Sequence, residues 1–264
     1  MTVTRTKHGA VEIVTINRPE IRNCIDGPTA RSLNAVWDAI EADDSIRVVI
    51  LTGAGDRAFC TGLDLKAVHR EGPQVVNEVV LPDTGWCGLT ERQFSKPLIA
   101  AVNGAAVAGG MELALACDFI VAADHATFKI NEVTLGACAD GGACFRLPHW
   151  IPLPLAKEML FTGAAIDAHR AYSSGLANRV VPAARLMDEA LELAQTIAAN
   201  PPPSVRAMKR LVHEVLDLPE SQAWEINNRY LQWSINTQNF AEGTGAYVEN
   251  RMPKFQGMDD FPGE

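Results

Sequence analysis

Three carboxylate residues lie in stretches of the sequence that otherwise carry little charge: Glu112, Glu132 and Asp140. A carboxyl group in apolar surroundings has a raised pKa and can exchange a proton near neutral pH. These residues therefore indicate general acid–base chemistry. Each also has a structural explanation when taken singly: a first-turn helix carboxylate for Glu112, a helix N-cap for Asp140 and a solvated side chain for Glu132.

The segment AVNGAAVAGGMELALACD, residues 101–118, offers a second kind of chemistry from its backbone. Its pattern predicts a strand, a tight turn of small residues and an Ala-rich helix that begins at Gly109 and Gly110. Free N–H groups at a helix N-terminus can stabilise an oxyanion. Glu112 would lie beside any group that binds there.

A related segment, AFCTGLDLK at residues 58–66, follows another apolar run. Gly62 permits a backbone conformation that other residues rarely adopt, so the N–H of Leu63 can point into a site instead of a strand ladder. The structural alternative is an ordinary turn between a strand and a helix.

Elsewhere in the chain, short apolar runs alternate with helical patterns, and this alternation predicts an α/β fold. The strands and helices of that fold must position the candidate residues. The Asn-Pro-Pro-Pro sequence at 200–203 ends the last helix of this part, and strand patterns stop beyond it. We therefore predict an α/β body at 1–199 and a helical region at 200–264. The predicted strands are 11–16, 48–51, 98–102 and 119–122, and the clearest helices are 33–40 and 186–199.

Composition limits the remaining possibilities. The net charge of −9 argues against nucleic acid as a partner, and no apolar run reaches the roughly 18 residues of a membrane span. Six cysteines without a CxxC pair indicate reduced thiols and a cytoplasmic protein. The six histidines form no ligand pair, which disfavours metal catalysis.

Taken in order, these motifs resemble the enoyl-CoA hydratase/isomerase (crotonase) family. The resemblance runs from Asn17-Arg18-Pro19 through AFCTGLDLK, AVNGAAVAGGMELALACD and NEVTLG to the tail EGTGAYVENRMPKF, nearly the whole chain. It implies a spiral body of repeated ββα units with a C-terminal helical oligomerisation region. Because those helices have apolar stripes and little body of their own to cover them, we expect a homotrimer or homohexamer.

The resemblance also implies roles for the site residues. The peptide N–H groups of Leu63 and Gly109 would hold the thioester oxygen of an acyl-CoA, and Glu112 and Glu132 would handle water and protons. The twenty-residue interval between the two glutamates matches the spacing in the family. The implied reaction is syn addition of water to a 2-enoyl-CoA. It requires no metal and no cofactor, since coenzyme A is part of the substrate.

Asp140 departs from the pattern, because hydratases of the family often carry Gly there. Members that isomerise double bonds, including dienoyl-CoA isomerases, resemble this chain in having an Asp. An enoyl- or dienoyl-CoA isomerase that moves protons between Glu132 and Asp140 is therefore the alternative, and a non-catalytic acyl-CoA-binding scaffold is a third reading. A further departure is Ala108, which replaces the first of three glycines usual in the family.

For the coenzyme, the resemblance implies an adenine pocket along the chain from Gly62 through Asp64 to Leu65. Arg22 would lie near the nucleotide phosphates, and Lys254 would do likewise, on a neighbouring subunit. Either one has an alternative reading as a solvated surface charge. Residues 67–95 correspond to the variable acyl pocket, where Trp86 and Leu89 are either acyl contacts or core residues.

Overall fold

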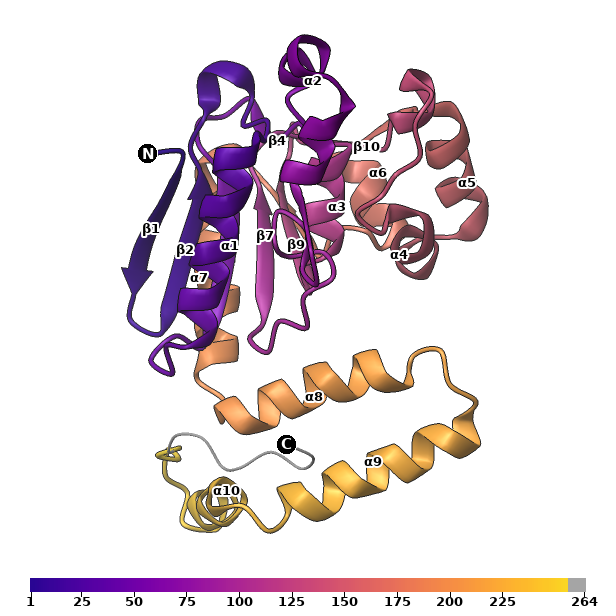
Figure 1. Cartoon of the computed structure of the whole chain (residues 1–264). Coiled ribbons are helices and arrows are strands. Elements are labelled where there is room, and N and C mark those ends of the chain that lie inside the picture. Colours follow the sequence, from indigo (N-terminus) through magenta and orange to yellow (C-terminus); the bar gives the residue numbers. More distant parts are fainter. Residues whose placement is uncertain (256–264) are drawn as a thin grey trace.

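The computed structural model describes residues 1–255 and contains one large sheet whose strands are mostly parallel (Figure 1). The order of strands is β1-β2-β3-β7-β9-β12, and β1 alone runs antiparallel to its neighbour. Every residue of β3 is buried, as expected for a strand covered on both faces. The strands are β1 (Val3–His8), β2 (Val11–Ile16), β3 (Val48–Gly53), β7 (Leu98–Val102), β9 (Phe119–Ala123) and β12 (Arg179–Val181).

A second, four-stranded sheet has the order β11-β10-β8-β4, with β4, β8 and β10 parallel. It consists of β4 (Ala58–Cys60), β8 (Ala105–Val107), β10 (Thr127–Lys129) and β11 (Ala165–Asp167). Strand β8 corrects the sequence prediction, which assigned these residues to a tight turn. The pairs β3–β4, β7–β8 and β9–β10 each place one strand in each sheet. A helix follows each pair: α2 (Leu65–Glu71), α3 (Gly109–Leu115) and the 3-10 helix η3 (Glu132–Leu135).

Alternate residues of the large sheet face two helix layers. Val49 and Leu51 belong to the main core, which includes Trp37 of α1 (Gly27–Glu41). Val48 and Ile50 lie in a second cluster with residues of α7 (Leu186–Ala198). The helices therefore cover opposite faces of the sheet, which follows from the two-residue period of a strand.

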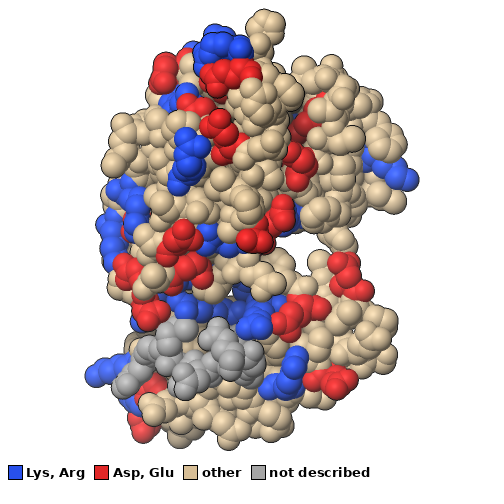
Figure 2. Space-filling view, in the orientation of Figure 1, with Lys and Arg blue, Asp and Glu red and all other residues tan. Residues whose placement is uncertain are grey.

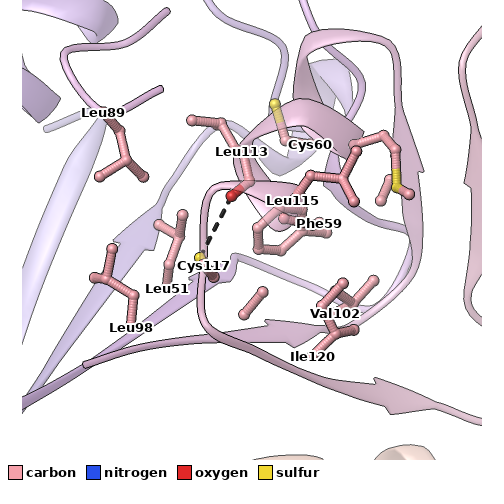
Figure 3. Packing of buried hydrophobic residues seen from close by; sticks show 14 of the residues in the cluster. Leu51, Phe59, Cys60, Leu89, Leu98, Val102, Leu113, Leu115, Cys117 and Ile120 are labelled. Atoms are coloured by element: carbon pink, nitrogen blue, oxygen red, sulfur yellow. Dashed lines mark hydrogen bonds between the residues drawn. The ribbon is translucent and has the colours of Figure 1, made fainter. Parts of the chain in front are cut away.

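The main core continues from the large sheet to α3, and Figure 3 shows it from close by. Phe59 and Cys60 of β4 pack there with Leu113 and with residues of β7 and β9. The thiol of Cys117 donates a hydrogen bond to the Leu113 carbonyl at 3.3 Å (Figure 3). This packing fixes α3, the helix that carries Glu112, against the strands.

Other short elements surround the strands. They are η1 (Pro19–Ile21), η2 (Pro73–Glu78), β5 (Val80–Leu81), β6 (Gly85–Trp86), α4 (Ala143–Trp150), α5 (Leu153–Thr162), α6 (Ala168–Ser174) and η4 (Ala183–Arg185).

Three helices follow residue 200: α8 (Pro202–Val215), α9 (Glu220–Ser234) and α10 (Gln238–Val248). They form a layer below the sheets in Figure 1. Two prolines of the predicted break begin α8, where their missing N–H groups cost nothing. The ammonium of Lys209 joins α8 to the body through Asp118 at 2.8 Å and the Lys96 carbonyl at 2.9 Å. In the part of the chain that the structure describes, no helix is long and apolar enough to cross a membrane.

Candidate active site

Three predicted site residues follow neighbouring strands of the four-stranded sheet. Leu63 follows β4, Gly109 begins α3 after β8, and Glu132 begins η3 after β10. These strands are parallel and adjacent, so their carboxyl ends meet at one edge of the sheet. The ββα repeat thus brings together residues that are far apart in the sequence.

The two backbone donors lie on segments in close contact. Gly62 has a φ of +79°, and a Cβ added to it would lie 3.1 Å from the Gly109 nitrogen. Within residues 1–255 the N–H groups of Leu63 and Gly109 donate to no acceptor. N–H groups on adjacent segments can donate to the same oxygen when both point toward it.

Glu112 is completely buried on the first turn of α3. Its Oε1 accepts hydrogen bonds from the N–H groups of Gly141 at 2.9 Å and Ala143 at 3.0 Å. Its Oε2 is buried and has no partner in the described part of the chain. The pKa of Glu112 is raised from 4.5 to about 7, and burial is the main cause. The side chain can therefore hold or release a proton near neutral pH.

Glu132 is half-buried, and its Oε2 likewise has no hydrogen-bond partner among the described residues. Burial raises the pKa of Glu132, and the negative charge of Asp140 raises it further. The negative charges of Glu132 and Asp140 also raise the pKa of Glu112. Asp140 itself is exposed, and it does not cap α4, whose N-cap residue is Gly142.

The sequence did not reveal which groups hold Glu112. A Cβ added to Gly141 would lie 2.6 Å from Glu112 Oε2, so any larger residue would displace the carboxylate. Arg146 donates to the carbonyls of Gly141 at 3.0 Å and Thr90 at 2.5 Å, tying this loop to the segment after β6. The adjacent glycines at 141 and 142 were the one available signal of a close approach.

The predicted coenzyme-binding residues separate into two groups. Gly62, Asp64 and Leu65 lie within one stretch of four residues. The Asp64 carboxylate, however, caps α2 by accepting from the N–H groups at positions 66 and 67. Arg22 lies beside them, because its carbonyl accepts a hydrogen bond from Thr61 Oγ1 at 3.2 Å. Arg22 also lines a pocket of about 540 Å³ together with Asp56, Arg57, Ala105, His125 and Ala183.

Lys254 lies elsewhere in the chain, after α10, and its N–H donates to Glu242 at 2.6 Å. Helix α10 lies below the sheets, whereas α2 lies above them in Figure 1. The single chain therefore does not bring Lys254 to Arg22. Among residues 1–255 no group of three or more His, Cys, Asp or Glu side chains could hold a metal ion, and all six cysteines are unpaired.

Comparison with known proteins identifies the fold and the family. A family model described as enoyl-CoA hydratase/isomerase matches residues 6–258. The chain belongs to the enoyl-CoA hydratase/isomerase family. The crystal structure of enoyl-CoA hydratase EchA1 from Mycobacterium marinum is 39% identical, with a TM-score of 0.90 over 97% of this chain and 99% of that one. The enoyl-CoA hydratase from Bacillus anthracis is 32% identical, with a TM-score of 0.92 over 98% of this chain and 100% of the other.

Curated relatives agree with this assignment to the enoyl-CoA hydratase/isomerase family. Carnitinyl-CoA dehydratase from Proteus mirabilis (strain HI4320) is 38% identical over 96% of this chain and 97% of its own length. The protein of that name from Escherichia coli (strain K12) is 37% identical over the same shares. The predicted crotonase fold and the predicted enzyme class, a lyase of the hydratase type, are confirmed.

Proposed function

We propose that the chain adds water in the syn sense to a 2-enoyl-CoA, giving a 3-hydroxyacyl-CoA. The observation that carries this proposal is a pair of buried oxygens on Glu112 and Glu132 that have no partner within residues 1–255, on the same edge of the sheet as two peptide N–H groups that donate to none of these residues. A water molecule between two carboxyl groups would satisfy both oxygens. Curated relatives are named dehydratases, which agrees with the proposed hydration because dehydration is the same reaction in reverse.

The peptide donors would activate the substrate. When water attacks C3 of a conjugated thioester, negative charge develops on the thioester oxygen. The N–H groups of Leu63 and Gly109 would stabilise that enolate-like oxygen, and losing one such donor typically costs on the order of 10²–10³ in rate. Their alignment comes from the backbone, so no side chain has to reorganise during the reaction.

The glutamates would move the protons. The ionised carboxylate accepts a proton from water while the oxygen of that water bonds to C3. The protonated carboxyl of the other glutamate delivers a proton to C2. One water molecule is added across the double bond, and one proton passed between the carboxyls restores the starting state. The pKa values of both side chains are raised, so one glutamate can remain protonated near neutral pH while the other is ionised. This supports one glutamate as the proton donor and the other as the proton acceptor.

Substrate binding would use the coenzyme part of the thioester. We infer that backbone atoms from Gly62 to Leu65 contact the adenine and that Arg22 contacts the phosphates. Lys254 would contribute from a neighbouring subunit of a homotrimer or homohexamer. We further infer that the reaction uses no cofactor beyond this coenzyme A and that the protein is cytoplasmic.

A second candidate function is isomerisation of an enoyl- or dienoyl-CoA by Glu132 and Asp140. It is favoured by the position of Asp140, whose charge raises the pKa of both glutamates. In this reaction Glu132 and Asp140 would transfer a proton between two carbons of the acyl chain, and no water would be consumed.

One experiment distinguishes these functions. Wild type and Asp140→Asn are compared on crotonyl-CoA, by loss of the conjugated enoyl absorbance, and on a 3,5-dienoyl-CoA, by appearance of the 2,4-dienoyl chromophore. We expect crotonyl-CoA turnover that survives the substitution. Dienoyl turnover that disappears in Asp140→Asn would instead establish the isomerase. Binding of both thioesters without any turnover would indicate a non-catalytic scaffold.

A further inference from the structure

The indole N–H of Trp86 in β6 lies next to the proposed site and has no partner among the described residues. The side chain is only 3% exposed, and its Nε1 is buried with no hydrogen-bond acceptor within residues 1–255. The nitrogen edge of the ring lies against Gly109. A Cβ added there would be 2.5 Å from Trp86 Cε2 and 2.8 Å from Nε1. The orphan donor therefore lies beside the proposed oxyanion-binding backbone.

A tryptophan with a purely structural role normally satisfies its N–H when buried. Trp37 does so, since its Nε1 donates to the Cys87 carbonyl at 3.1 Å. Leaving the Trp86 donor unpaired costs stability, so an acceptor that arrives with a ligand would recover that cost.

The surroundings hold Trp86 in place. Its backbone N–H donates to Thr90 Oγ1 at 2.9 Å, and the Thr90 carbonyl accepts from Arg146 at 2.5 Å. Arg146 also binds the Gly141 carbonyl, next to the N–H that holds Glu112. The orientation of the indole is thereby linked to the loop that positions the glutamate.

In the proposed site the thioester oxygen already has two hydrogen-bond donors without the Trp86 indole. A carbonyl oxygen has two lone pairs, and the peptide donors of Leu63 and Gly109 would use both. A third donor beside the same backbone segment therefore fits a second oxygen. We propose that Trp86 determines specificity by donating its indole hydrogen bond to an oxygen carried by the acyl group, as in a 3-hydroxyacyl thioester. This proposal rests on the acyl-CoA function proposed above.

The test compares two thioesters that differ by one hydroxyl, butyryl-CoA and 3-hydroxybutyryl-CoA. Their dissociation constants are measured by calorimetry in a Glu132→Gln background, which slows turnover of the hydroxylated thioester, with and without Trp86→Phe. We expect Trp86→Phe to weaken 3-hydroxybutyryl-CoA binding by about tenfold and to change butyryl-CoA binding by less than about twofold. Trp37→Phe is the matched control, and it should leave the preference for the hydroxylated ligand intact.

A second measurement keeps the tryptophan and remains valid if Trp86→Phe does not fold. With indole nitrogens labelled for NMR, the Trp86 N–H proton should shift downfield in the 3-hydroxybutyryl-CoA complex and not in the butyryl-CoA complex. An identical Trp86 signal in both complexes, or equal losses of affinity for both ligands, would overturn the proposal. Failure of both thioesters to bind would instead contradict the acyl-CoA function itself.

Discussion

Glu132 lies at the edge where three strands end, and its buried Oε2 has no hydrogen-bond partner in the part of the chain that the structure describes. The substitution Glu132→Gln keeps the shape of the side chain and removes its ability to take up a proton. We expect turnover of crotonyl-CoA to fall by about 10²–10⁴, the usual contribution of a general acid or base. The thermal midpoint should change little, because Oε2 makes no hydrogen bond in the described residues. Turnover near the wild-type value would contradict the mechanism.

Glu112 should make the stability of the protein depend on pH. In the folded state it keeps its proton up to about pH 7, whereas the unfolded chain releases it near its ordinary pKa of 4.5. The folded state thus binds more protons between these values, and the free energy of unfolding falls as the pH rises through this window. The full effect is on the order of 3 kcal/mol.

The substitution Glu112→Gln removes the titrating group and keeps an oxygen that can accept from Gly141 and Ala143. Urea unfolding of wild type and variant at pH 5 and pH 8 isolates this residue, because all other titrations are shared. We expect the variant to gain stability relative to wild type at the higher pH. The same change with pH in both proteins would show that Glu112 is ionised throughout.

Individual residues differed in how far the sequence could reveal them. Glu112 and Glu132 could be found because a carboxylate in a charge-poor stretch is conspicuous. The hydrogen-bond partners of Glu112 could not be found in this way, because they are the backbone N–H groups of Gly141 and Ala143. Almost every residue has such a group, so the sequence does not mark these two. For Trp86 the sequence did not decide between a contact with the acyl group and a place in the core. Only three-dimensional packing shows whether an indole N–H has an acceptor.

At the scale of elements, the entry into α3 contains a strained residue. Ala108 precedes the helix with φ 54° and ψ −128°, a region that residues other than glycine rarely occupy. Replacing it by glycine should relieve the strain and raise the free energy of unfolding by about 1 kcal/mol, after the greater entropy of unfolded glycine is counted. Chemical unfolding checks this. A destabilised Ala108→Gly would mean that the methyl contact with Gly62 outweighs the strain.

The loop between η3 and α4 depends on the absence of a side chain at Gly141. In Gly141→Ala the added Cβ would lie 2.6 Å from Glu112 Oε2, so the carboxylate would have to move. We expect crotonyl-CoA turnover to fall at least about tenfold and stability to fall by about 1–3 kcal/mol. Gly245→Ala in α10 is the control, since nothing lies within 4 Å of its added Cβ. Equal activity in the two variants would contradict the assigned role of the loop.

The larger elements could be predicted and the smaller ones could not. Strands β2, β3, β7 and β9 lie where short apolar runs predicted them, and helices α1 and α7 lie where apolar periodicity did. Strands β4, β8 and β10 have only three residues each, too few for a period to be recognised. They are strands because they pair with one another, as in the Ala106–Phe128 register, and that pairing is set by the spiral and not by local sequence.

At the scale of the whole molecule, the C-terminal helices carry exposed apolar side chains. Figure 2 shows charged residues of both signs on the face drawn, with much uncharged surface over the lower helices. A groove of about 720 Å³ is lined by residues of α8, α9 and α10 together with Phe255. Met208 is 69% exposed, and Tyr247 and Val248 are more than 80% exposed. Apolar surface of this extent is typical of a protein–protein interface.

We therefore expect the chain in solution to have three or six times its own mass of 28.5 kDa. Light scattering after size-exclusion chromatography measures this directly. Because a charge at a buried interface costs far more than one on an exposed surface, Tyr247→Asp and Met208→Asp should shift the protein toward the monomer. Gln222→Asp, also on an exposed surface of these helices, should leave the mass unchanged. A monomeric wild type would instead show that these helices are covered by something other than copies of the chain, and Lys254 could then not reach a neighbouring site.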